Sequence, residues 1–237
     1  MDVCILFLAI MTFCGLITCL IILPFVYPKA KMLKNAPLVS VAALRPGYFS
    51  VRGSVIPMEL MRSEMTNKYC VYYNNEIQYY QGGKNAHWVT EKSVTYFRKF
   101  ILMDPTGGVM INPSRAEVEI PSKVAASTFN QNFRALLSKY KVPTTTWFGF
   151  TKTMRCLEKR IEPDMELTVI GTVSKDITLP TPTGLVFNKA DARFLITPRK
   201  YEDMKKKYDT GMRALKISMA LCVLFLTIFT LLFIASI

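Results

Sequence analysis

Two long uncharged apolar runs, one at each end of the chain, constrain its fold more than any other feature. The C-terminal run covers 21 residues, from Ile217 to Ile237. At about 1.5 Å per residue such a helix extends about 31 Å, enough to cross a hydrocarbon core of about 30 Å. The N-terminal run, from Val3 to Val26, also lacks charge and is longer than an ordinary buried helix. We expect transmembrane helices over residues 1–26 and 214–237.

A cleaved signal peptide is the alternative for the N-terminal run. Signal peptides begin with basic residues and carry an apolar region of about 7–15 residues before a cleavage site with small side chains. Here only Met1 and Asp2 precede a run that is longer than this, and no A-x-A-like site closes it. The sequence therefore favours a retained anchor.

Basic residues are confined to the segment between the two runs. All 30 lysine and arginine residues lie there, and the whole chain has a formal net charge of +13. Many of these residues adjoin the apolar runs, which favours anionic lipid head groups over nucleic acid as their partner. The positive-inside rule would keep the segment between the runs on the cytoplasmic side. The candidate lipid contacts are Lys29, Lys31, Lys34, Lys205, Lys206, Lys207, Arg213 and Lys216.

Short strands dominate the prediction for the segment between the runs. Runs rich in β-branched and aromatic residues are separated by Gly, Asn and Pro, as in "QGGKN" and "DPTGG". The predicted strands cover residues 48–55, 70–80, 87–103, 108–113, 116–120, 147–158, 165–177, 184–187 and 193–197. One amphipathic helix is expected over residues 128–140. The predicted fold is therefore a β-rich α+β domain, a curled sheet or small barrel over residues 46–197, after a basic linker over residues 27–45.

A second amphipathic helix is predicted directly before the C-terminal run, over residues 198–213. Tyr201, Met204, Tyr208 and Met212 form an apolar stripe opposite a lysine-rich face. This pattern is typical of a helix that lies in the membrane interface, and equally of a solvated helix that packs on its own domain. Both interpretations remain open at this point.

Residues that could carry chemistry are scarce. His87 is the single histidine, and neither a G-x-S-x-G motif nor a phosphate-binding loop is present. Cys70 and Cys156 are the only cysteines between the runs, so at most one disulfide could form there and a four-ligand zinc site is not expected. The acidic residues between Glu158 and Glu166 alternate with basic ones, which predicts a solvated, charge-balanced stretch. We expect no cofactor and no metal, and His87 is the best candidate if the chain is an unrecognised hydrolase.

Four stretches of the sequence resemble a known family. They are "VRGSV" (51–55), "HWVTEKSVTYFRKFILMDPTGGVMINPSRAEVEIP" (87–121), "RCLEKRIEPDMELTVIGTVSKD" (155–176) and "FLITPRKYEDMKKKYDTGMRALKI" (194–217). Their order and the placement of the anchors are similar to the "beside a membrane" domain of the GIDE/MULAN family. Members of this family are ubiquitin ligases of the mitochondrial outer membrane, and the resemblance covers roughly residues 46–237.

The resemblance implies a two-pass protein of the mitochondrial outer membrane with its domain in the intermembrane space, opposite to the orientation that the charged flanks favour. In the family a zinc-binding RING follows the second anchor, and this sequence ends where that RING would begin. We therefore expect a non-catalytic domain that binds a protein or lipid partner beside the membrane. The alternatives are an accessory or truncated component of a ubiquitin ligase, which would associate with ubiquitin machinery or a RING-bearing paralogue, and a structural subunit of a membrane complex.

Overall fold

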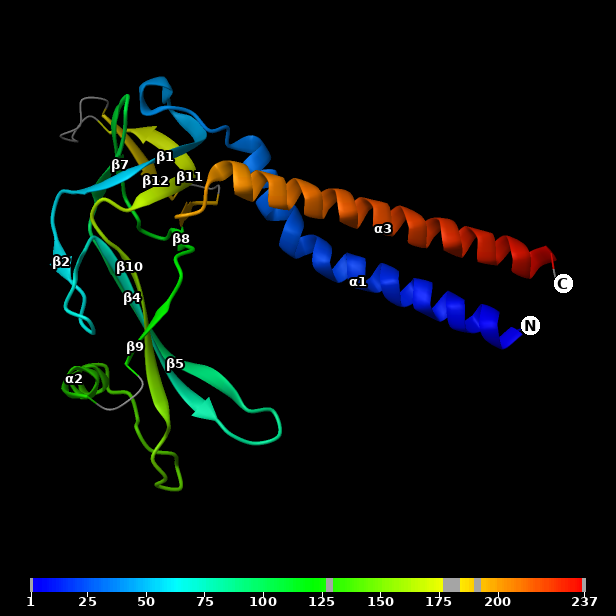
Figure 1. The fold of residues 1–237 in the computed structure, drawn as a ribbon, viewed down its shortest axis with the longest axis horizontal. Helices are drawn as coiled ribbons and strands as arrows, with labels where there is room; N and C mark the ends of the chain where they lie inside the picture. Colours follow the sequence, from blue (N-terminus) through cyan, green and yellow to red (C-terminus); the bar gives the residue numbers. More distant parts are fainter. Residues whose placement is uncertain (1, 127–129, 177–183, 190–192, 236–237) are drawn as a thin grey trace. The chain divides into compact units, whose positions relative to one another are not determined.

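The computed structural model describes residues 2–126, 130–176, 184–189 and 193–235 (Figure 1). It divides into two compact units, a helical unit made of residues 1–37 and 200–237, and a β-rich unit made of residues 38–199. The predicted β-rich α+β class is confirmed for the second unit.

The helical unit consists of two long helices, α1 (Asp2–Asn35) and α3 (Tyr201–Ala235), which run antiparallel to each other (Figure 1). The Tyr201 hydroxyl donates to the backbone oxygen of Leu33 at 2.8 Å. Further along the pair, Cys19 Sγ lies 3.4 Å from Ser218 Oγ. The helices therefore touch along much of their length.

One helix among the described residues is long and apolar enough to cross a membrane, and its candidate span lies within Tyr201–Ile228 of α3. The expected pair of transmembrane helices is thus found for the C-terminal run alone. The N-terminal run is helical as well, but α1 continues to Asn35, through Pro24 and Pro28, so much of the expected linker is helix. Likewise, α3 is one continuous helix from Tyr201, with no break between the expected juxtamembrane and transmembrane parts.

A closed ring of five strands forms the first part of the β-rich unit. In ring order the strands are β1 (Gly47–Pro57), β6 (Phe100–Asp104), β7 (Gly107–Ile111), β12 (Leu185–Asn188) and β11 (Glu166–Lys175). Each neighbouring pair is antiparallel except β7 and β12, and the ring closes because β1 pairs with both β6 and β11. This confirms the small barrel rather than the curled sheet. Two further strands, β13 (Leu195–Thr197) and β8 (Glu117–Val118), extend the sheet beyond β11.

Buried aliphatic and aromatic side chains fill the barrel, and a glycine allows it to close. The core includes Val51, Val55, Leu102, Val109, Ile111, Val169 and Phe187. β1 pairs with β11 as far as Ser54 and with β6 from Ser54 onward, so Gly53 directly precedes the change of partner strand and its backbone lies very close to that of β6. A Cβ atom at Gly53 would lie 2.3 Å from the backbone oxygen of Met103. Glycine is therefore required at this corner of the barrel.

A four-stranded antiparallel sheet forms the second part of this unit, in the order β5 (His87–Phe97), β4 (Tyr72–Gln81), β10 (Met154–Ile161) and β9 (Lys123–Ala126). Asn130 is the N-cap of helix α2 (Gln131–Lys139), and its side chain accepts a hydrogen bond from the Phe133 amide at 2.8 Å. This cap satisfies an otherwise unpaired N–H at the first turn. A second core joins α2 to the sheet through Ile77, Phe133, Leu136, Leu137, Met154 and Cys156.

The remaining elements are short. A 3-10 turn, η1, covers Val41–Ala43, and the strands β2 (Met61–Arg62) and β3 (Tyr69–Cys70) form a small hairpin. The single strand expected over residues 87–103 is two strands, because β5 belongs to the four-stranded sheet and β6 to the barrel. Of the expected strand over residues 147–158, only the part from Met154 onward is a strand.

Candidate functional site

The predicted lipid contacts lie toward one end of the helical unit. Leu33 faces Tyr201 and Cys19 faces Ser218 across the helix pair, so the lysines near the end of α1 and those near the start of α3 occupy the same end. All of them are exposed except Lys29, which is half-buried. The antiparallel pairing therefore brings residues that are far apart in the sequence toward the same end of the helical unit, with Arg213 and Lys216 further along α3 than the rest. These residues, here called the basic cluster, are Lys29, Lys31, Lys34, Lys205, Lys206, Lys207, Arg213 and Lys216.

Exposed apolar side chains follow this basic cluster on both helices. They include Leu20 and Ile21 on α1 and Leu221, Leu224 and Phe225 on α3. Only 6% of the apolar segment that makes α3 a candidate span is buried. An apolar surface of this extent is unusual in a soluble monomer and suits contact with lipid chains.

The apolar stripe of α3 is buried where the helix begins. Tyr201 and Met204 are buried, and Tyr208 and Met212 are half-buried. Lys205, Lys206 and Lys207, in the same part of the helix, are exposed. Because Tyr201 is bound to Leu33 of α1, at least this part of the stripe serves helix pairing.

The candidate catalytic residue His87 is exposed at the start of β5. Its Nδ1 lies 2.7 Å from the backbone oxygen of Asn85, in the same loop. A general base is normally oriented by a buried carboxylate or carbonyl group beside a substrate pocket. His87 does not line either of the two cavities of the β-rich unit that are described below.

The two cysteines of the β-rich unit are free and buried. Burial, together with the smaller effect of the nearby Glu158 carboxylate, raises the pKa of the Cys70 thiol to about 11. Burial likewise raises the pKa of Cys156 to about 12. Because the thiolate is the reactive form, neither cysteine is a nucleophile at neutral pH.

A buried ion pair lies on β10, where the sequence predicts a solvated stretch. The Glu158 side chain is 0% exposed, and its Oε2 accepts from Arg160 Nη1 at 2.6 Å and from the Thr66 hydroxyl at 2.6 Å. Arg160 also binds Glu162 at 2.7 Å. The prediction of charge balance is therefore met, but Glu158 is buried and not solvated. Glu158 continues the every-second-residue spacing of the buried Met154 and Cys156 on β10, and this spacing was the available signal.

This ion pair borders a cavity of about 490 Å³ lined also by Lys123, Asp164 and Met165. Acidic and basic side chains both line it, and the described residues include no group of three His, Cys, Asp or Glu side chains that could hold a metal ion.

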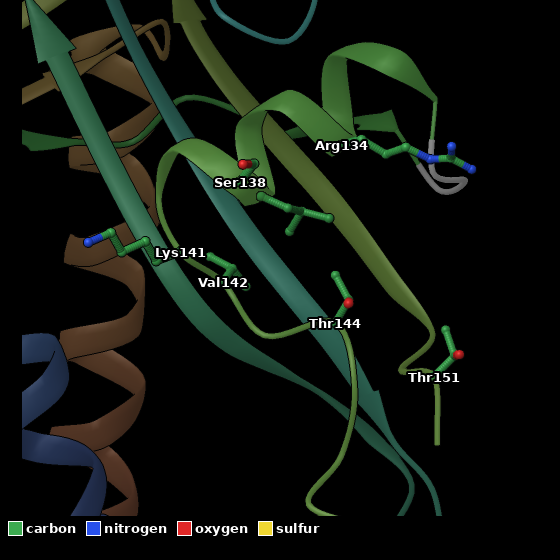
Figure 2. Close-up of a pocket in the computed structure, with 7 residues that line it drawn as sticks. Arg134, Ser138, Lys141, Val142, Thr144 and Thr151 are labelled. Carbon is green, nitrogen blue, oxygen red and sulfur yellow. The ribbon is translucent and has the colours of Figure 1, made fainter. Parts of the chain in front are cut away.

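A second cavity, of about 460 Å³, lies between α2 and the loop that leads to β10 (Figure 2). Ser138, Thr144 and Thr151 contribute hydroxyl groups to it. Figure 2 shows Arg134 and Lys141 on opposite sides of this cavity, with their charged ends directed away from each other. The cavity is therefore bordered by two outward-facing cations.

Directly beside this cavity, the loop over residues 145–151 carries the most exposed aromatic residues of the β-rich unit. Trp147 is 89%, Phe148 67% and Phe150 71% exposed. The predicted strand over residues 147–158 includes these aromatic residues, but the structure has a loop here and its strand begins only at Met154. Aromatic residues stand directly before and after Gly149, and the segment lacks the alternation of a half-buried strand. This pattern was the available signal for an exposed turn.

A comparison with protein families supports the resemblance found in the sequence. The family model "GIDE: E3 Ubiquitin ligase" matches residues 71–230, which include β4 to β13 and most of α3. Searches of curated proteins and of solved structures found no significant match. Because the family match covers more than half of the chain, the protein belongs to the GIDE family of E3 ubiquitin ligases.

Proposed function

We propose that this chain is a membrane-anchored component of a ubiquitin-ligase system, and that its β-rich unit binds a partner instead of transferring ubiquitin itself. The observation that carries the proposal is the extent of the family match. The matched residues include most of the β-rich unit and the candidate membrane span of α3, so both parts lie within the region that the family shares.

The chemistry of the β-rich unit supports a binding role. Transfer of ubiquitin through a thioester on the ligase needs an accessible thiol with a low pKa. Cys70 and Cys156 have the opposite properties, since both are buried and have raised pKa values. In a partner-binding unit they serve as small apolar residues of the core.

We further propose that the protein crosses the membrane twice, in the mitochondrial outer membrane as members of the resembled family do. Helix α1 supports the second crossing because it is 34 residues long, lies along α3 and exposes Ile17, Leu20 and Ile21. Prolines such as Pro24 and Pro28 are tolerated in membrane helices when neighbouring groups satisfy the freed backbone oxygens.

Proximity labelling in living cells tests the proposed function. A labelling enzyme fused to the full chain should enrich components of the ubiquitin system, relative to a control in which residues 38–199 are replaced by a flexible linker. Equal enrichment by the two proteins would show that the β-rich unit recruits no partner. If the full chain and the control both failed to recover ubiquitin machinery, the ubiquitin-ligase assignment would be overturned.

A further inference from the structure

The loop over residues 145–151, here called the aromatic loop, is a hydrogen-bonded turn. The Thr146 amide donates to the Phe150 oxygen at 2.8 Å, and the Gly149 amide donates to the Thr146 oxygen at 2.9 Å. Gly149 has a φ of +85°, which side chains other than glycine rarely adopt. The three aromatic rings are therefore presented by an ordered turn, so little conformational entropy opposes their binding.

The aromatic loop lies at the end of the four-stranded sheet that is away from the barrel (Figure 1). The Lys152 amide donates to Thr144 at 2.8 Å, which closes the base of the loop beside the start of β10. At the same end of the sheet, Tyr80 pairs with Trp88 across β4 and β5, with ring centroids 5.3 Å apart. Aromatic side chains thus lie in or beside both loops at this end of the sheet.

The charges around the aromatic loop that are not balanced by an ion pair are positive. Lys152 is paired with Glu91 at 3.1 Å, and Lys139 with Glu64. Arg134 and Lys141, which border the adjacent cavity, are exposed and have no ion pair among the described residues. Exposed aromatic rings surrounded by unbalanced cations match the interface of an anionic bilayer, where Trp and Tyr are enriched and phosphates attract basic side chains.

We propose that the aromatic loop inserts Trp147, Phe148 and Phe150 into the interfacial layer of an anionic membrane, with Arg134 and Lys141 on lipid phosphates. The inference rests on the proposed membrane anchoring, because an anchored domain meets a bilayer at high effective concentration. We favour a bilayer over a protein partner as the ligand of these rings. The rings project from the tip of a turn, and from there they can enter the apolar layer of a membrane. The hydroxyl groups of Ser138 and Thr144 beside the loop supply further donors for phosphate oxygens.

Tryptophan fluorescence can test this insertion directly, because the chain contains only two tryptophans, Trp88 and Trp147. In the full chain, Trp88→Phe leaves Trp147 as the single reporter. The protein is reconstituted into anionic vesicles whose lipid chains carry bromine, which quenches a tryptophan in contact with them. In a second arm, brominated anionic vesicles are added to protein in unbrominated vesicles, so that contact with an opposing membrane is detected.

Insertion predicts that Trp147 is quenched and blue-shifted in at least one of the two arms. Trp88, observed alone in Trp147→Phe, is less exposed than Trp147 and lies 4.0 Å from the Arg155 guanidinium, so it should be quenched less. Replacing Phe148 and Phe150 together with Ser should weaken insertion of the loop, measured as lost quenching of Trp147 in the responding arm, by at least about tenfold, because two large apolar side chains no longer leave water. Arg134→Gln with Lys141→Gln should weaken it further and reduce its salt dependence.

Tyr69→Ser is the matched control, since Tyr69 is also an exposed aromatic residue but lies near the other end of β10, where Val71 binds Ile161. It should leave the quenching of Trp147 unchanged. Absence of Trp147 quenching in both arms, from protein that floats with its vesicles and keeps its circular dichroism spectrum, overturns the proposal. A photo-crosslinker at position 148 that joins a protein and no lipid would also overturn it. Protein that does not float with vesicles would instead refute the proposed anchoring.

Discussion

Gly53→Ala tests whether the barrel closes as the structure describes. A Cβ atom at this position would lie 2.3 Å from the Met103 oxygen and 2.8 Å from the Met103 backbone carbon. Both are backbone atoms of β6, so no side-chain rotation can relieve the clash and the two strands must move apart.

The expected net effect is a loss of about 1–3 kcal/mol in the free energy of unfolding, typical of overpacking in a filled core. Alanine restricts the unfolded chain more than glycine does, which offsets only about 0.4–1 kcal/mol of this loss. For a unit of this size, each 1 kcal/mol lowers the midpoint temperature by about 2–4 °C.

The assay is thermal and urea unfolding of the full chain in detergent, followed by near-ultraviolet circular dichroism. Gly82→Ala is the matched control, because a Cβ atom there would meet nothing within 4 Å. It should leave the midpoint unchanged within error. If Gly53→Ala were as stable as Gly82→Ala, β1 would not be the strand that joins β6 to β11.

Three further predictions concern charge and thiol chemistry. The Arg160 guanidinium hydrogen-bonds Glu162 and holds the pKa of Glu162 below its usual value of 4.5, so this pair stabilises the folded state above that pH and the contribution is lost as the pH falls. Glu162→Gln should therefore flatten the loss of stability between about pH 5 and pH 3 in acid unfolding, and an unchanged acid profile would contradict the pairing. Cys70 and Cys156 should resist maleimide at pH 7.5 until denaturant is added, which mass spectrometry detects, and rapid native labelling would disprove their burial. Neutralising the three lysines at positions 205–207 should weaken binding of a peptide of residues 198–216 to anionic vesicles by about 1 kcal/mol per lysine, and equal binding would assign these charges another role.

Local sequence signals predict some elements of this fold well. Helix α2 follows from its apolar spacing, and Asn130 caps it as that residue type commonly does. The small barrel follows from the short β-prone runs and their turn residues, and β1 and β11 lie close to where alternation places them.

Other features depend on contacts between distant residues, which a single sequence does not encode locally. The break between β5 and β6 at Arg98 and Lys99 exists because the chain leaves one sheet for another. Burial of Glu158 depends on Arg160 and Thr66, of which Thr66 lies 92 residues away. For the candidate site, the sequence identifies the basic residues beside the apolar runs, whereas their gathering into one cluster requires the pairing of α1 with α3.

We propose that this chain binds a partner within a ubiquitin-ligase system and does not itself transfer ubiquitin. Ubiquitin discharge from a charged conjugating enzyme measures this difference directly. The full chain, purified alone and reconstituted in vesicles, should discharge no more ubiquitin than empty vesicles. The same chain captured with its partners from native membranes should discharge it. Robust discharge by the purified chain, or none from the native complex, would contradict the account.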